Sequence, residues 1–320
     1  MSLAVCLFLY GFAVTTLAPR LLAQLTRGGI APGFGLVAWV SAICSVAGSW
    51  AAAVIILAVD VVRDWAEPSR PVWSSCYSQL HDAATGSYGG VVQGGLIALA
   101  AFVTLAAAVL LLRVIRSLVR ARSSTHEHAR MARVAGRHDS GLDAVVLDLS
   151  EPAAYCVAGK PHTVVITRGA LSALDDRHLA AVLAHERAHL AGRHHLLLAL
   201  TRGLAATFSR IELFTLGAAE VARLVEMRAD DVAAREHGHR TVLQALLALS
   251  GVADSPTGSL SATAVGLATR VERLTAPCET ALRTRARRLL IAATTLVTLG
   301  PLITVLLAAI GIAICAPITA

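Results

Sequence analysis

The sequence predicts a mainly α membrane protein with four transmembrane helices and an α+β domain between the third and the fourth. Three observations predict this fold class. Hydrophobic residues make up 56% of the 320 residues, whereas charged residues make up 15% against about 25% in globular proteins. Aromatic residues are only 4%, so Ala, Leu and Val carry the apolarity. The formal net charge of +7 arises entirely within residues 113–288.

Four uncharged segments account for the apolar excess, because a helix needs about 20 apolar residues to cross the hydrocarbon core. We expect spans at about residues 1–19, 34–59 and 91–112, which together form a membrane region over residues 1–112. The fourth span is expected over residues 289–320, with a kink where Gly300 is followed by Pro301.

Arginines flank the spans in a pattern that predicts their orientation. Arg20 and Arg27 follow the first span, and further arginines follow the third and precede the fourth. The positive-inside rule places these residues in the cytoplasm. We therefore expect a multi-pass protein of the cell membrane, with both termini and the loop 60–90 external and the domain 113–288 cytoplasmic. Such a basic region beside a membrane predicts the lipid bilayer as a partner and no direct nucleic acid binding.

The cytoplasmic domain begins with a polar stretch, residues 120–140, that we interpret as a linker. Runs rich in Val then predict strands at residues 144–149, 154–158 and 162–167, the last two joined as a hairpin by the turn at residues 159–161. Helical periodicity begins after Asp175, which can cap a helix. It continues over residues 194–216, 218–236 and 241–249, and a Ser/Gly/Pro-rich break follows at residues 254–261.

The first of these helices contains an HExxH motif, His185-Glu186-Arg187-Ala188-His189. Residues four apart share a helix face, so His185 and His189 can bind one zinc ion, while Glu186 can reach a water molecule beside it. Zinc lowers the pKa of such a water toward about 7, and the glutamate takes its proton as a peptide carbonyl is attacked. The motif predicts metal-assisted peptide hydrolysis, with Glu186 as the general base.

A catalytic zinc site needs a third protein ligand, and two residues compete for this role. Glu226 lies on a later helix, with Asp230 one turn further on the same face, where it could accept the second ring N–H of a ligating histidine. His195 completes the alternative spelling HExxHxxGxxH. A continuing helix would turn His195 away from His189, and the apolar pattern resumes after it as if the helix went on. We therefore favour Glu226.

These motifs together resemble those of integral-membrane zinc peptidases. The run from Leu179 to Leu190, followed by Glu226-x-x-Ala229-Asp230, is most similar to the BlaR/MecR antibiotic-sensor peptidases, with the Ste24/HtpX group as close kin. The resemblance implies a zincin-like metallopeptidase domain, a Zn2+ cofactor held by His185, His189 and Glu226, and Glu186 as the base. It also implies signal transduction, with a cytoplasmic BlaI-type winged-helix repressor as substrate and cleavage of the chain itself.

The sequence departs from the BlaR/MecR pattern in its sensor. The chain ends at Ala320 directly after the last span, and its single lysine, Lys160, has Val157 three residues before it where the sensors have the serine of SxxK. We therefore expect no β-lactam sensing by that chemistry. A signal would instead come through the external loop around Trp65, Trp73 and Cys76, through the spans, or through a partner.

Two other functions stay open. One is a constitutive quality-control protease of the Ste24/HtpX type, and the other is a membrane receptor or scaffold that keeps a zinc-stabilised fold without turnover. If the protein is a protease of either kind, we expect the strand 162–167 to border the active-site cleft and to pair with the extended backbone of the substrate. The substrate, the activating signal and a homo-oligomeric state are all left open by the sequence.

Overall fold

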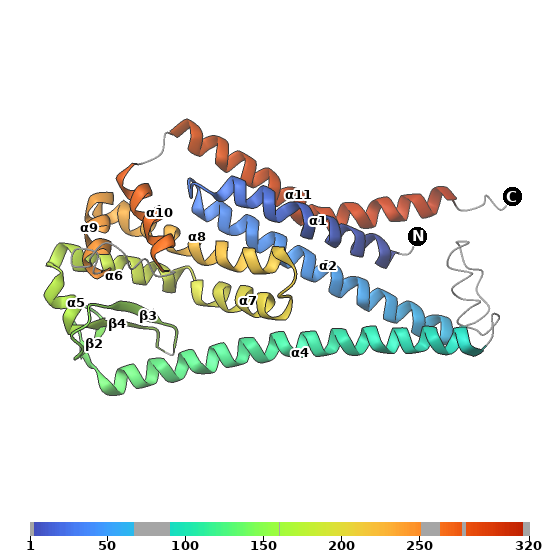
Figure 1. Ribbon diagram of the computed structural model, residues 1–320, viewed down its shortest axis with the longest axis horizontal. Coiled ribbons are helices and arrows are strands. Elements are labelled where there is room, and N and C mark those ends of the chain that lie inside the picture. Colours follow the sequence, from blue (N-terminus) through green and yellow to red (C-terminus); the bar gives the residue numbers. More distant parts are fainter. Residues whose placement is uncertain (1–2, 67–89, 160, 251–262, 277–279, 316–320) are drawn as a thin grey trace.

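The computed structural model describes residues 3–66, 90–159, 161–250, 263–276 and 280–315. Four long helices run along its long axis (Figure 1): α1 (Leu3–Thr26), α2 (Pro32–Ala66), α4 (Gly90–Ala135) and α11 (Thr280–Cys315). A small sheet lies at one end, and the remaining helices lie around it and toward the middle of the molecule. The N-terminal end of α1 and the C-terminal end of α11 both point toward the other end.

Three of the described helices are long and apolar enough to cross a membrane, namely α1, the Pro32–Val59 part of α2 and the Thr280–Ile310 part of α11. They expose large apolar side chains such as Phe12 and Leu302. The expected span at residues 91–112 lies in α4, which is not among the three, so the number and order of four spans stay a prediction. Figure 1 shows α11 bending midway, and this helix contains Pro301, which cannot donate a helical hydrogen bond.

The interpretation of residues 120–140 as a linker is wrong for most of that segment, because α4 continues as a helix to Ala135. The stretch contains Ala, Arg, Glu and Met, which favour helices, and no Gly or Pro before Gly136. Its polar character reflects exposure to solvent along one helix and not a loss of secondary structure. Figure 1 shows α4 extending from the membrane region to the sheet.

The sheet has four strands in the order β1-β2-β4-β3. The strands are β1 (Arg137–Asp139), β2 (Ala144–Leu147), β3 (Ala154–Val157) and β4 (Thr163–Thr167). The predicted hairpin is confirmed, since β3 and β4 pair antiparallel. However, β4 also pairs with β2 in parallel, so both of its edges are occupied. The expectation that the strand 162–167 pairs with substrate is therefore wrong, because β1 and β3 are the edge strands.

Helices cover the sheet and support the HExxH motif. They are α5 (Arg168–Ala173), α6 (Asp176–Ala191), α7 (His194–Thr207), α8 (Glu212–His237), α9 (His239–Leu249) and α10 (Thr263–Thr275). Asp175 caps α6, accepting the His178 amide over 2.8 Å. Val164 and Ile166 of β4 pack against Leu179 and Leu183 of α6 in one apolar cluster, which places α6 across the sheet.

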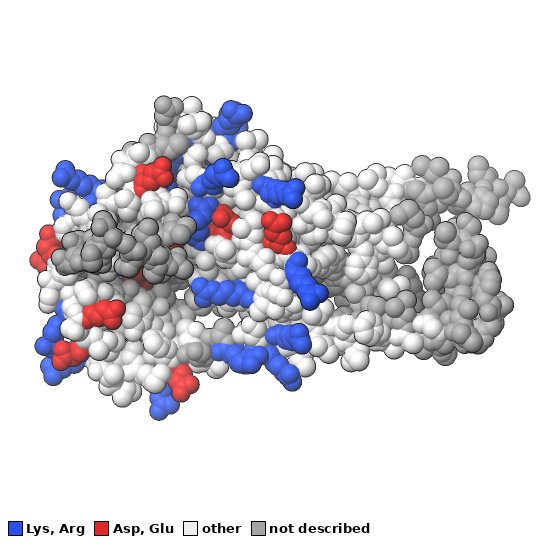
Figure 2. All heavy atoms as spheres, in the orientation of Figure 1, with Lys and Arg blue, Asp and Glu red and all other residues white. Residues whose placement is uncertain are grey.

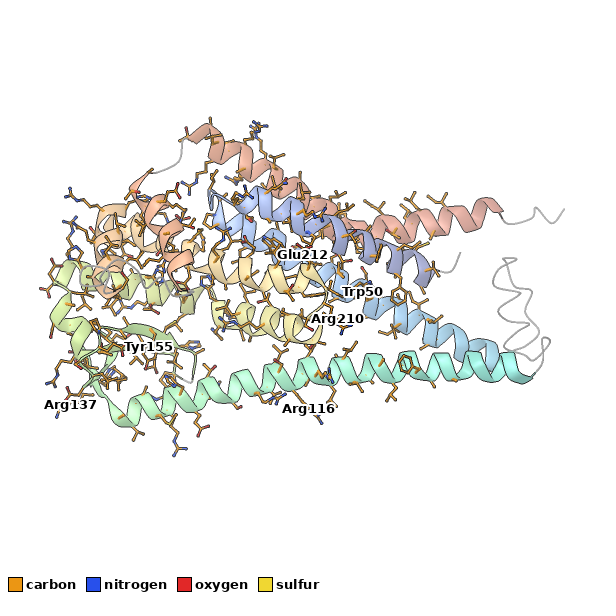
Figure 3. The ribbon with its side chains drawn as sticks, viewed as in Figure 1. Trp50, Arg116, Arg137, Tyr155, Arg210 and Glu212 are labelled. Atoms are coloured by element: carbon orange, nitrogen blue, oxygen red, sulfur yellow. The ribbon has the colours of Figure 1, made fainter. Side chains whose placement is uncertain are left out.

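The helix predicted over residues 194–216 is interrupted, because α7 ends at Thr207 and α8 begins at Glu212. Figure 3 shows Arg210 and Glu212 at this junction. The largest apolar cluster lies nearby and joins α8 to the membrane helices. In it, Trp39 of α2 and Phe214 and Leu224 of α8 are fully buried. The break at residues 254–261 and the residues Trp73 and Cys76 lie outside the described residues.

Candidate metal centre

His185 and His189 lie one turn apart on α6, and their side chains point the same way. Their Nε2 atoms are 3.1 Å apart, and each side chain is 12% exposed. Two imidazole nitrogens this close can share one hydrogen between them or one metal ion. The HExxH spacing therefore produces the convergence that the sequence predicts.

The side chain of Glu226 approaches this pair from α8. Its Oε2 lies 3.5 Å from His185 Nε2, and its Oε1 lies 3.5 Å from His189 Nε2. The three ligand atoms lie within 4.8 Å of one another, and no other described group of histidine, cysteine or acidic side chains meets this criterion. Two imidazoles and one carboxylate are a donor set that zinc uses in catalytic sites. The residues therefore fit a zinc ion.

His195 lies apart from this cluster, although the chain does turn before it. The helix α6 ends at Ala191, and Arg193 adopts the left-handed backbone conformation with φ of 49°. The expected continuation of the helix is wrong here, because this turn separates α6 from α7. The ring of His195 lies against His162, with centroids 6.0 Å apart, and its Nδ1 is buried without a hydrogen-bond partner among the described residues.

The same turn brings His194 onto the metal centre. His194 is 4% exposed, and its Nδ1 lies 2.9 Å from His189 Nδ1. One of these two nitrogens must donate to the other, so His194 orients the His189 ring through the nitrogen that faces away from Glu226. The fit is tight, because a Cβ at Gly192 would overlap the His194 ring.

Asp230 is fully buried and holds the ring of His185. Its Oδ1 lies 3.0 Å from His185 Nδ1. Both carboxylate oxygens also accept hydrogen bonds from Arg270 over 2.7 Å. Burial alone would raise the pKa of Asp230, but the hydrogen bonds from Arg270 and His185 outweigh it and lower the pKa to about 2. Asp230 is therefore ionised at neutral pH and keeps the His185 Nδ1 protonated.

Arg270 comes from α10, a helix that sequence patterns did not predict. Besides its paired bonds to Asp230, its Nη1 lies 3.3 Å from Glu226 Oε2. It therefore connects the third candidate ligand to the carboxylate that orients the first. The domain carries many arginines, so the type of residue did not single this one out. The usable signal was Asp230 itself, since a carboxylate on an apolar helix face requires a buried cation.

The two histidines differ in charge although they are neighbours. Burial lowers the pKa of His185, but hydrogen bonds to Asp230 and Glu226 outweigh burial and raise it to about 9. Burial lowers the pKa of His189 to about 4, and the charge of Glu226 only partly opposes this. The metal-free pair thus carries one positive charge at neutral pH, located on His185.

Glu186 lies on the side of α6 that faces β3. Burial raises the pKa of its carboxyl group, whereas the charge of His185 and hydrogen bonds from Cys156 oppose the shift. Burial and the nearby Glu186 raise the pKa of the Cys156 thiol to about 12, so this thiol stays protonated and donates. The arrangement provides a carboxylate of raised basicity next to the candidate metal and the edge strand.

Comparison with known proteins gives one match. The model of peptidase family M48 matches residues 119–278, which contain α6, α8 and α10. Neither a curated protein nor a solved structure matches the chain.

Replacing Asp230 with asparagine tests its role in holding His185. We expect D230N to bind zinc about 10–100-fold more weakly, because a ligand histidine loses its charged partner. The measurement is a competition between the purified full chain and a chelator of known affinity. D231N is the matched control, since Asp231 pairs with Arg273 and touches no candidate ligand. Equal zinc affinity in D230N and D231N, with both proteins folded, would contradict this role.

Zinc binding should release a proton. Below the metal-free pKa of about 9, His185 carries protons on both ring nitrogens, and a metal at Nε2 must displace one of them. Titration calorimetry at about pH 7.5 in buffers of different ionisation enthalpy should show about one proton released, and zinc affinity should rise with pH until about 9. Identical heats in all buffers would show that His185 is already neutral.

Proposed function

The chain belongs to peptidase family M48, and on this basis we propose that it is a membrane-bound zinc endopeptidase that cleaves cytoplasmic proteins. Membership indicates a metalloprotease. The observation that carries the finer proposal is the convergence of His185, His189 and Glu226 within 4.8 Å, with Glu186 beside them. These four residues would form the metal site and the general base.

In the proposed reaction, Glu186 transfers protons, and Asp230 and His194 position the histidines. When bound, zinc supplies a Lewis acid that acidifies water and polarises the scissile carbonyl. Glu186 takes a proton from the attacking water and later delivers it to the leaving amine, a role suited to a carboxylate whose pKa is raised by burial. Asp230 and His194 hold the two histidine rings in place through the nitrogens that face away from the site.

An extended substrate would lie along β3. The Thr167 amide donates to the Ala153 carbonyl over 3.0 Å, and hydrogen-bonded positions alternate along an antiparallel pair. The backbone groups of Tyr155 and Val157 therefore face β4, and those of Ala154 and Cys156 point away from it, where the Cys156 N–H donates to Glu186. Strand addition there binds a peptide through its backbone, directly beside Glu186.

The substrate we propose is a cytoplasmic BlaI-type repressor, with cleavage of the chain itself as a second activity. This proposal rests on the likeness of the motifs and their place between apolar segments to the BlaR/MecR sensors. Both termini would then be external and the site cytoplasmic. Quality control of the Ste24/HtpX type fits the family match equally well, since binding through the backbone demands little of the substrate sequence. A non-catalytic zinc scaffold would need the three candidate ligands but would give Glu186, beside them, no role.

The conservative variant E186Q tests catalysis and identifies substrates together. We expect new protein N-termini that are present in cells with the wild-type chain to disappear in cells with E186Q, because glutamine cannot take a proton. Zinc content should be unchanged. The control is E236Q, on an exposed glutamate of α8. One cleaved winged-helix regulator would support the signalling role, whereas many damaged membrane proteins would support quality control. Identical N-termini in all three strains would refute the peptidase.

The variant A154P tests strand addition at β3. Proline removes the outward N–H of Ala154 and leaves the ladder between β3 and β4 intact, which edge strands tolerate. We expect cleavage of an identified substrate to fall at least ten-fold, with zinc content and thermal stability retained. A154S keeps the N–H and is the control. Unimpaired cleavage by folded A154P would show that substrate binds elsewhere.

A further inference from the structure

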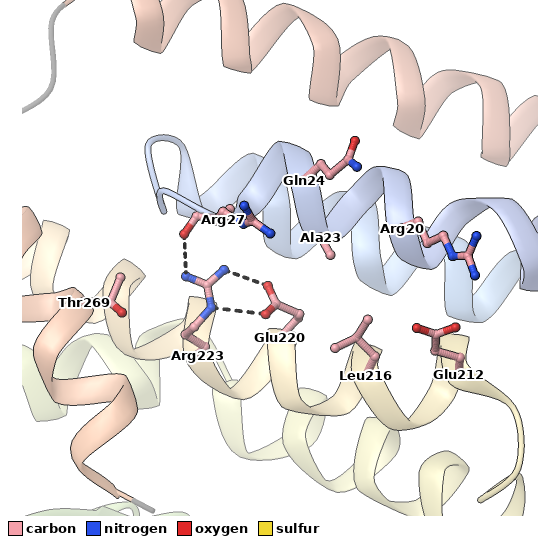
Figure 4. Close-up of a pocket in the computed structure, with 9 residues that line it drawn as sticks. All are labelled: Arg20, Ala23, Gln24, Arg27, Glu212, Leu216, Glu220, Arg223 and Thr269. Carbon is pink, nitrogen blue, oxygen red and sulfur yellow. Dashed lines mark hydrogen bonds and ion pairs between the residues drawn. The ribbon is translucent and has the colours of Figure 1, made fainter. Parts of the chain in front are cut away.

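A second hollow lies away from the metal centre, between α1 and α8 (Figure 4). Its volume is about 430 Å3, and its walls carry five charged residues: Arg20, Arg27, Glu212, Glu220 and Arg223. Nothing in the peptidase chemistry uses this cavity. We refer to it below as the α1–α8 pocket.

The deeper charges of the pocket already have partners. Arg223 donates to Glu220 over 2.7 Å and to the backbone carbonyl of Thr26 over 2.8 Å. Glu220 also accepts from the Thr26 hydroxyl over 3.1 Å. These contacts satisfy the last carbonyls of α1 and attach its end to α8. Their charges cancel, so they form the floor of the pocket and not its binding groups.

The other two arginines of the pocket, Arg20 and Arg27, lack such partners among the described residues. Arg20 and Arg27 are exposed, and within the described part of the chain neither guanidinium forms a hydrogen bond or ion pair. Arg20 lies on α1, Arg27 directly follows its last residue, and both line the same pocket. Figure 4 shows both side chains at the pocket. Only Glu212 opposes them, which leaves the mouth of the pocket with an excess of positive charge.

The pocket lies where the apolar part of α1 ends. Leu17 is 71% exposed and Leu21 is 51% exposed, and they flank Arg20 on the same helix. In Figure 2 the arginines gather in the middle of the molecule and at the sheet end, whereas the described part of the opposite end is almost free of charge on this face. A ligand at Arg20 would thus have an apolar surface on one side and water on the other.

We propose that the α1–α8 pocket binds the phosphate group of an anionic phospholipid, held by Arg20 and Arg27. Guanidinium groups bind phosphate through charge-assisted hydrogen bonds, and basic pockets between membrane helices bind lipid headgroups. The acyl chains extend along the exposed leucines of α1. A soluble phosphate compound would use the arginines alone and leave those leucines without a role.

The test uses the full chain purified in a mild detergent. Phosphatidylglycerol, phosphatidylcholine or inorganic phosphate is added, and bound lipid is counted by native mass spectrometry while thermal stability is recorded. We expect phosphatidylglycerol to remain bound and to raise the melting temperature, and the other two to do neither. In the double variant R20Q/R27Q the affinity for phosphatidylglycerol should fall at least ten-fold.

The matched control is R113Q/R116Q, which removes the same charge from two exposed arginines of α4. This variant should bind phosphatidylglycerol as the wild type does. Equal losses in both double variants would show general surface attraction and overturn the pocket. Equal stabilisation by phosphatidylcholine would overturn the role of lipid charge, and equal stabilisation by inorganic phosphate would overturn the lipid as ligand. Because neither readout depends on cleavage, failure here leaves the peptidase proposal untouched.

Discussion

The candidate metal centre depends on one buried carboxylate, that of Asp230. This side chain has no exposed surface, and an isolated charge in such a place would cost several kcal/mol. Arg270 and the ring of His185 provide the two partners that make the burial tolerable. Each partner comes from a different helix, so satisfying one carboxylate joins α6, α8 and α10. The same ion pairs and hydrogen bonds thus orient the candidate ligand His185 and hold the three helices together.

Local periodicity explains why the centre of the site could be predicted from the sequence. A helix of 3.6 residues per turn places His185 and His189 on one face wherever α6 lies. The same spacing places Glu226 and Asp230 on one face of α8. Both side chains therefore approach the histidines once α8 packs against α6. The hairpin of β3 and β4 was predictable for a similar reason, because its turn residues are adjacent in sequence. Each of these features depends on residues that lie close together in the sequence.

The features that could not be predicted depend on contacts between distant segments. Hydrophobic patterning indicated three strands but not their order, and the parallel pairing of β2 with β4 places β4 inside the sheet and β3 at its edge. Arg270 follows Asp230 by 40 residues across a polar break, and no local pattern distinguishes it from other arginines. The polar end of α4 was mistaken for a linker because exposure and lack of structure produce similar compositions. For the order of the strands and for Arg270, the deciding contact is long-range.

The helix α8 carries the candidate ligand Glu226 and also contacts two of the helices that could cross a membrane. Arg223 holds the end of α1, and Glu226 follows it by three residues, less than one turn, so the two side chains belong to the same rigid stretch of helix. Phe214 and Leu224 of the same helix pack with Trp39 of α2 in one apolar cluster. Glu226 and the residues that contact α1 and α2 therefore lie on the same helix.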